Sequence, residues 1–279
     1  MTEAVHLVDI VNQTDLVEEI EGEEKLGQPM VHLTRTHPVG TFDLFLLPGA
    51  RKRTFPGREG RLRTPLPVDS DRATFESGRG HVGGAARWSR SAGIWDVGLS
   101  HFFGTTREPQ MTVGFDPTGR PALIPHYAVI HQSGLDVQAV SGQWLWKLET
   151  IYRTGQNDPF SAAAGGFEYT LPHSSGLEIG LILEYLFDDR GGQTLFDDDL
   201  AIGCRLGFND LASSEMLASV IVDREGDESI GSLTASRRVG EAWKVFVEGR
   251  TFQTNGGVTN PLFGFRRDDH LALRLTRYF

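Results

Sequence analysis

Residues 177–187 read LEIGLILEYLF, and apolar side chains occupy every odd position of this stretch. The side chains of a β-strand point alternately to opposite faces, so the odd positions would form one continuous apolar face. The even positions would form a second face, where Glu178, Gly180 and Glu184 lie together with Ile182 and Leu186. The stretch therefore predicts a strand with one wholly apolar side and one side that carries charge.

The same alternation recurs along the chain, most clearly at 95–103, 200–208 and 243–247. It predicts strands at 30–37, 41–48, 79–90, 95–104, 127–140, 145–154, 165–171, 176–187, 199–208, 215–223, 229–238, 243–253 and 270–279. Short turns at 38–40, 92–93, 141–143 and 173–175 alternate with long polar loops near 49–78, 105–126, 155–164, 188–198 and 254–269. Short and long connections alternate in this way in outer-membrane barrels.

Alternation alone fits a soluble β-sandwich or a lipocalin-like barrel as well as a membrane barrel. The charged face of these strands is too long for the core of a small soluble barrel, which favours the membrane class. Aromatic residues near strand ends, where rings prefer the membrane interface, point the same way: Trp88, Trp95, Trp146, Tyr152, Tyr169, Tyr185, Phe187 and Trp243.

We therefore predict an all-β fold, an antiparallel transmembrane β-barrel of about 14 strands in this chain or a part of a larger barrel. Residues 1–279 would form a single barrel domain, closed by its last strand. Within it, 1–29 would be an irregular N-terminal segment, which either contributes one strand at about 4–11 or contacts the lumen.

The last ten residues alternate until Arg277 and end on an aromatic side chain. This end resembles the C-terminal insertion signal of bacterial outer-membrane proteins, which the barrel-assembly machinery reads. Leu271, Leu273, Leu275 and Phe279 match that signal, whereas Arg277 departs from the usual apolar residue, although a long arginine can reach an interface. The resemblance implies a location in the bacterial outer membrane, with lipid, lipopolysaccharide and the assembly machinery as partners.

Residues 2–15 are similar to a segment of larger porin-like proteins of proteobacteria, loosely akin to alginate-export channels. In those proteins further strands and a signal peptide precede the segment. No basic region followed by an apolar region is visible at the start of this chain. The resemblance thus implies that Met1 marks a truncated or a misassigned start.

Composition argues against several other classes. A formal net charge of -10 argues against a nucleic-acid partner, which needs a basic surface. The single cysteine, Cys204, excludes an internal disulfide and a multi-cysteine zinc site. Residues 78–83 match the dinucleotide fingerprint but lead into a predicted strand, where glycine packing is the better reading. Asp188, Asp189, Asp197, Asp198 and Asp199 could bind a divalent cation, but a solvated acidic rim is favoured. We expect no metal and no cofactor.

Residues 51–63 form a basic run in an acidic protein, with one acidic residue, Glu59. The loop would either lie outside and touch lipopolysaccharide phosphates, or fold into the lumen as an anion-attracting constriction. Its cations are Arg51, Lys52, Arg53, Arg58, Arg61 and Arg63.

These observations favour a porin-like channel for passive passage of small polar solutes. Its lumen would be lined by Arg87, Asp96, Asp136, Lys147, Glu149, Arg153, Glu168, Glu178, Glu184, Arg205, Lys244, Glu248, Arg250 and Arg274. A non-conducting structural or adhesion barrel is the alternative. An enzyme is disfavoured because the sequence has neither a His-Glu-x-x-His pair nor a Gly-x-Ser-x-Gly elbow. A Ser-His pair built from His81 or His101 with Ser89 or Ser100 would be the sign of one.

Overall fold

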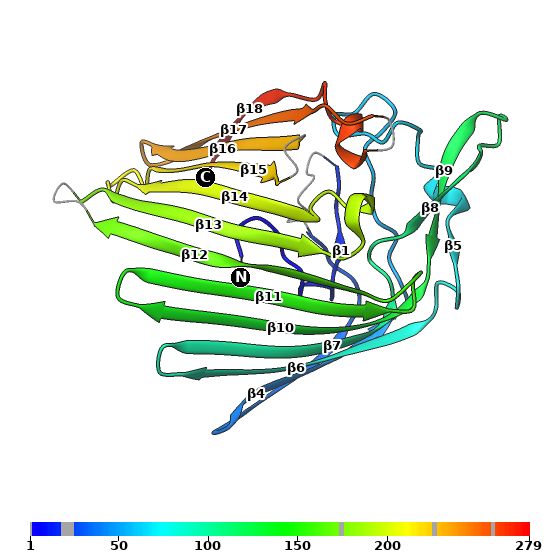
Figure 1. Cartoon of the computed structure of the whole chain (residues 1–279), viewed down its shortest axis with the longest axis horizontal. Helices are drawn as coiled ribbons and strands as arrows, with labels where there is room; N and C mark the ends of the chain where they lie inside the picture. The colour runs from blue at the N-terminus through cyan, green and yellow to red at the C-terminus, as the bar shows by residue number, and fades with distance from the viewer. Residues whose placement is uncertain (1, 18–24, 173–175, 225–227, 258–259) are drawn as a thin grey trace. The chain divides into compact units, whose positions relative to one another are not determined.

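A computed structural model describes residues 2–17, 25–172, 176–224, 228–257 and 260–279. The fold is all-β, dominated by one antiparallel sheet of thirteen strands (Figure 1). The helical elements in the described part of the chain are three 3-10 turns: η1 (Ser70–Arg72), η2 (Gly191–Gln193) and η3 (Pro261–Gly264). None of the described helices is long and apolar enough to cross a membrane.

Neighbouring strands of the large sheet follow the order of the chain, except that β7 pairs with β10 and β6 with β4. From one edge to the other the strands are β18 (His270–Arg277), β17 (Trp243–Thr254), β16 (Glu228–Val239), β15 (Glu215–Asp223), β14 (Asp198–Gly207), β13 (Glu178–Asp188), β12 (Phe160–Pro172), β11 (Trp144–Thr154), β10 (Val129–Ser141), β7 (Trp95–Thr105), β6 (Val82–Ala92), β4 (Gly40–Pro48) and β3 (Val31–His37). Each of the thirteen strands predicted by alternation is present.

Two predicted loops contain strands that the alternation did not predict. The loop at 105–126 holds the hairpin of β8 (Gln110–Phe115) and β9 (Pro121–Tyr127), which forms a small sheet with β5 (Thr74–Phe75) from the loop at 49–78. Pro121 and Pro125 in β9 hide the signal, because proline argues against a regular strand. The loop predicted at 155–164 is also shorter, since β12 begins at Phe160. The turn predicted at 173–175 lies outside the described residues.

The sheet is not closed into a barrel, so the predicted closure by the last strand is wrong for this chain. Its edge strands are β3 and β18. Thirteen strands of alternating direction give two edge strands that run the same way, so antiparallel closure needs an odd number of further strands. Residues 4–11 do not supply one. In the described part of 2–29, strand structure is limited to β1 (Gln13–Thr14), paired with β2 (Lys25–Leu26).

The chain divides into two compact units. Among the described residues, unit 1 lies within Val5–Val137 and Leu148–Ala163, and unit 2 within Thr2–Ala4, Gln138–Lys147 and Ala164–Phe279. An apolar cluster of Ile10, Leu47, Phe102 and Ile130 forms one core of unit 1. In unit 2, cross-strand register places one buried residue from each of β13 to β17 in a row: Glu184, Ala201, Ile221, Ile230 and Phe252.

Burial along single strands is the inverse of that in a soluble protein. On β13 the exposed side chains are Leu181, Leu183, Tyr185 and Phe187, whereas Ile182, Glu184, Leu186 and Asp188 alternate with them and are buried. On β11 the buried positions hold Lys147, Glu149, Ile151 and Arg153, and the exposed ones include Trp144, Trp146, Leu148 and Tyr152. Soluble proteins rarely bury charge while exposing long apolar side chains. We call the buried side of these strands the charged face and the other side the apolar face.

Candidate functional site

The charged face holds ionisable side chains with almost no solvent exposure. Glu149 is 0% exposed and Glu184 1%, and Lys147, Arg107 and Arg153 are also buried. A charge removed from water must be paired or hydrogen-bonded, because desolvation alone costs several kcal/mol per ion, roughly. The partners of these groups therefore define the site.

In unit 2, two cations share three carboxylates. Lys147 Nζ lies 3.7 Å from Glu3 Oε2, 3.8 Å from Glu168 Oε2 and 4.0 Å from Glu184 Oε1. Arg205 Nη2 lies 2.7 Å from Glu3 Oε2, and its Nε lies 3.4 Å from Glu168 Oε1. Three of these five residues come from neighbouring strands β12, β13 and β14, where pairing fixes their spacing.

Glu184 also binds the beginning of the chain. Its carboxylate accepts hydrogen bonds from Glu3 N at 2.8 and 3.0 Å and from Ala4 N at 3.0 Å. These charge-assisted bonds satisfy a carboxylate that has lost its water.

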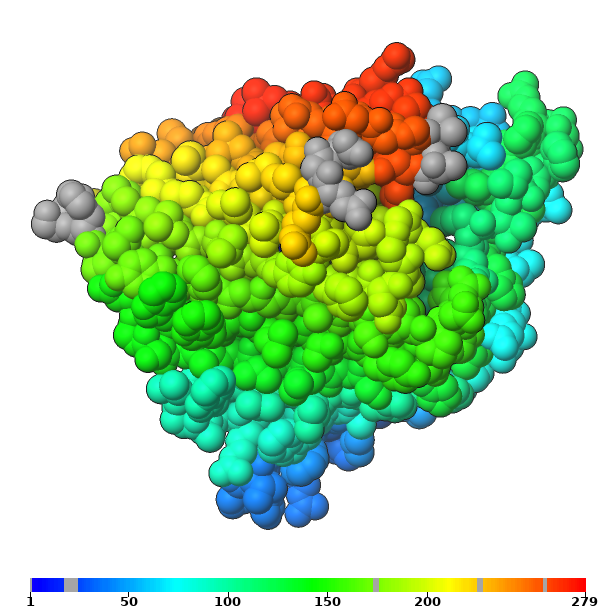
Figure 2. Space-filling model, viewed as in Figure 1, coloured from blue at the N-terminus to red at the C-terminus, as the bar shows by residue number. Residues whose placement is uncertain are grey.

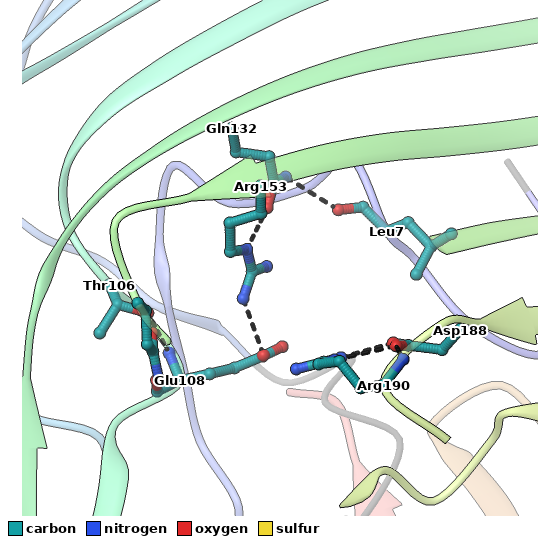
Figure 3. Close-up of polar contacts among 8 residues, drawn as sticks. Leu7, Thr106, Glu108, Gln132, Arg153, Asp188 and Arg190 are labelled. Carbon is teal, nitrogen blue, oxygen red and sulfur yellow. Dashed lines mark hydrogen bonds and ion pairs between the residues drawn. The ribbon is translucent and has the colours of Figure 1, made fainter. Parts of the chain in front are cut away.

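In unit 1, a polar chain runs across β10 and β11 to the loop after β7 (Figure 3). Arg153 Nε donates to Gln132 Oε1 at 2.8 Å, and Arg153 Nη1 donates to Glu108 Oε2 at 2.8 Å. Gln132 Nε2 in turn donates to the carbonyl oxygen of Leu7 at 3.1 Å. The Arg153 guanidinium also lies 5.2 Å from the centre of the Phe160 ring.

A bidentate ion pair joins β6 to β10 in the same unit. Arg87 Nη1 and Nη2 donate to the two carboxylate oxygens of Asp136 at 2.6 and 2.8 Å. The pair lines a cavity of about 440 Å³ whose wall also includes Asp96, Arg90 and His37. A cavity of this size with charges of both signs could hold a small polar solute.

Arg107, in the loop after β7, is buried against the chain's own N-terminal residues. Burial lowers the pKa of its guanidinium to about 10, still far above neutral pH. The group therefore keeps its charge and needs acceptors, which the carbonyl oxygens of Ile10 and Val11 supply at 3.1 and 2.8 Å.

No family model, no curated protein and no solved structure matches this chain.

All fourteen residues predicted to line a lumen lie in strands of the large sheet. Among them, Arg87, Asp136, Lys147, Arg153, Glu168, Glu184, Arg205, Lys244, Glu248 and Arg250 form ion pairs within the sheet or with neighbouring segments. Asp96, Glu178 and Arg274 are exposed. The role of these residues as a lumen lining stays a prediction.

The six cations of the basic loop do not share one environment, since some are exposed and others are partly buried. Arg51, Arg58, Arg61 and Arg63 are exposed, and Arg58 Nη2 pairs with Asp116 Oδ2 of the β8–β9 turn at 2.9 Å. Lys52 donates to the Ser70 carbonyl oxygen, while burial lowers the pKa of Arg53.

The prediction of a solvated acidic rim is wrong for Asp188 and Asp199, which are buried, and two of its five aspartates have basic partners. Asp188 pairs with Arg190 at 2.5 Å and Asp198 with Arg224 at 2.8 Å. Within the described ranges, no group of three or more histidine, cysteine or carboxylate side chains is placed to hold a metal ion.

Reasoning from the sequence missed Glu3, Arg107, Glu108 and Gln132. Gln132 could have been found, since it has the same parity as Asp136 on β10 and so points to the same face. Arg107 and Glu108 lie in a loop, where no periodicity tells which side a residue takes. Glu3 was missed for the same reason, because it lies in an irregular segment.

A serine–histidine contact lies on the exposed side of unit 1. His101 Nδ1 is 2.9 Å from Ser133 Oγ, joining β7 to β10. The predicted serines were Ser89 and Ser100; Ser100 Oγ is instead 3.5 Å from the Gly134 carbonyl oxygen. In the described part of the chain, the second ring nitrogen of His101 has no hydrogen bond to a carboxylate or an amide group.

Proposed function

We propose that this chain is the wall of a channel in the bacterial outer membrane and that small polar solutes pass along its charged face. The observation that carries the proposal is the inversion of burial, with charged side chains such as Glu149 and Glu184 inside and long apolar side chains outside. Lipid solvates an apolar exterior, and a polar interior is typical of transmembrane barrels.

The apolar face of unit 2 is continuous across strands. Register places Leu181, Cys204, Ala218, Leu233, Gly249 and Leu271 in one row from β13 to β18. Of these, Leu271 is 74% exposed. Contiguous apolar surfaces beyond a few hundred Å² mark membrane or partner contacts. In the space-filling view, side chains of β13 and β14 lie against each other with no opening between the strands (Figure 2).

Aromatic side chains support a membrane interface at one end of these strands. Trp144 and Trp146, at the start of β11, stack with ring centres 5.5 Å apart, and Trp144 also contacts Phe167 and Tyr169 of β12. Trp243 begins β17, where the Arg277 guanidinium lies 5.5 Å from its ring centre. Rings with a polar edge gather at headgroup depth in membrane barrels.

The charged face supports passage of polar solutes. Its side chains carry both signs within a few ångströms, as in the group of Lys147, Glu168 and Arg205. Charges of mixed sign across a polar path orient solutes and tune selectivity without chemistry. Lipopolysaccharide and the barrel-assembly machinery belong to the same proposal, with exposed Leu271, Leu273, Leu275 and Phe279 as the assembly signal.

Planar-bilayer recording tests the proposal. Protein refolded together with further strands that close the sheet between β3 and β18 should give discrete conductance steps, and protease protection in vesicles should show insertion in the same preparation. A protein that inserts but never conducts would support the non-conducting barrel instead. A protein that remains soluble and folded without lipid or detergent would contradict both.

A second candidate function is ester hydrolysis at the lipid-facing surface, which the Ser133–His101 contact favours. His101 would take the hydroxyl proton while Ser133 Oγ attacks an ester carbonyl, and would return that proton to the alcohol as the ester C–O bond breaks. Water, deprotonated by His101, would then attack the acyl-serine and release the acid and the free Ser133 hydroxyl. Phosphonate labelling tests it: wild type should react, and Ser133→Ala and His101→Ala should not. Absence of labelling in the inserted wild type would remove this candidate.

A further inference from the structure

Residues 5–11 have no regular secondary structure, yet buried strand side chains hold their backbone. Glu149 Oε2 accepts hydrogen bonds from Leu7 N at 3.0 Å and from Val8 N at 3.3 Å. Gln132 Nε2 donates to the Leu7 carbonyl oxygen. A carboxylate and an amide thus bind both backbone groups of one residue.

The same pattern is repeated further along the segment. Arg107 donates from Nε to the Ile10 carbonyl oxygen and from Nη2 to the Val11 carbonyl oxygen. All five hydrogen bonds reach main-chain atoms of a segment that bends at Leu7 and Val8, so they recognise the peptide backbone rather than particular side chains. Specificity comes from apolar contacts: Leu7 and Val8 pack on Ile151, Phe160 and Ala162.

We propose that unit 1 carries a binding site for a bent peptide segment on its charged face. Glu149, Gln132 and Arg107 form the site, and the chain's own residues 5–11 fill it and can be released. Release would expose these charges to solute, so the segment acts as a tethered plug; this consequence rests on the proposed channel function.

Release is compatible with the fold because the segment contributes no strand to the sheet. The ladder from β3 to β18 is complete without residues 5–11. When the segment leaves, Glu149 and Arg107 replace their hydrogen bonds to the peptide main chain with hydrogen bonds to water. Water can enter because this face of the sheet is polar. The segment is held by these hydrogen bonds and by apolar contacts, and its release must also withdraw Ile10 from the cluster with Leu47, Phe102 and Ile130.

A disulfide can lock the segment in place. A Cβ atom built on Gly134 would lie 3.5 Å from Val8 Cβ, within the range of disulfides, and the Ser100 hydroxyl beside it can rotate away. The variant is Val8→Cys with Gly134→Cys in a Cys204→Ser background, since Cys204 is the natural thiol. Oxidation should cut the open fraction in bilayer recordings at least about tenfold, and reduction should restore it.

Glu149→Gln tests the site without a cross-link. The amide loses the charge that strengthens the bonds to Leu7 N and Val8 N, so the open fraction should rise about tenfold. Glu241→Gln, at an exposed turn residue with no described role, is the matched control and should change nothing.

Each outcome decides. Failure of the disulfide to form would overturn the placement of the segment, and equal conductance of locked and reduced protein would overturn release. If no variant conducts, the channel proposal fails. Release of the segment is then tested separately, by the rate at which a polar maleimide labels Val8→Cys in the Cys204→Ser background. Glu149→Gln should then speed labelling about tenfold, and an unchanged rate would refute the proposal.

Discussion

Arginine at the centre of the apolar face should destabilise the protein far more than arginine near the end of the same strand. Leu183 lies five residues from each end of β13, which spans Glu178–Asp188, and is 38% exposed. Five residues of a strand span about 17 Å, or about 13 Å of depth at a typical tilt, which is half of an apolar band of about 25 Å. Leu183 would thus sit near the bilayer midplane.

Arginine at midplane costs about 2–4 kcal/mol, and near an interface about 0–1 kcal/mol. Leu183→Arg should therefore lower the folded-to-unfolded ratio about 30- to 1,000-fold, at about 1.4 kcal/mol per factor of ten. Phe187→Arg is the matched control, because Phe187 lies on the same face near the strand end and is 42% exposed.

The assay is urea-dependent folding of both variants in lipid vesicles, followed by tryptophan fluorescence. A soluble strand with exposed side chains would tolerate arginine at both positions. Equal unfolding free energies for the two variants would therefore refute the assignment of the apolar face to lipid.

Three further predictions concern a buried ion pair, a turn carboxylate and the basic loop. Arg153→Ala should lower the unfolding free energy by about 2–3 kcal/mol, less than for a fully buried pair because Glu108 is partly exposed, as urea titration would show. Hydrogen bonds, above all from the Thr118 hydroxyl, lower the pKa of Asp116 in the folded protein, so its ionised carboxylate stabilises the β8–β9 turn. The turn should keep this stabilisation at pH 3.8, the ordinary pKa of the group, and lose it only as the pH falls through the lower pKa of the folded state. Amide hydrogen exchange at Thr118, compared between wild type and Asp116→Asn, measures the loss. Serine in place of the four exposed arginines of the basic loop should shift the reversal potential toward cations, with a smaller shift in 1 M salt, where the Debye length is about 3 Å.

The strands could be predicted because their two faces demand opposite chemistry. On β13 each step from Leu181 to Phe187 changes the side from the apolar face to the buried face that holds Glu184, so a shift of one residue would place Glu184 on the apolar face and bury Leu181, Leu183, Tyr185 and Phe187. This constraint depends only on the alternation of residues within one strand. It fixes strand position and facing without any knowledge of the neighbours.

Closure and the site could not be predicted in the same way. Closure depends on whether β3 and β18 find partners, which alternation within a strand does not encode. The bonds from Glu149 and Arg107 to residues 7–11 use main-chain atoms, which every sequence provides equally. The β8–β9 hairpin was missed because prolines in β9 outweigh a short alternating signal.

Accessibility along β13 tests the central claim most directly. Single cysteines at 178–188, in a Cys204→Ser background, would carry nitroxide labels in protein reconstituted into vesicles. Collisions with oxygen, which concentrates in lipid, and with a water-soluble nickel chelate would be compared at each position. Positions 181, 183, 185 and 187 should favour oxygen, and their neighbours should not, giving a period of two. Preferential access of the nickel chelate to the odd positions would contradict a lipid-facing apolar face.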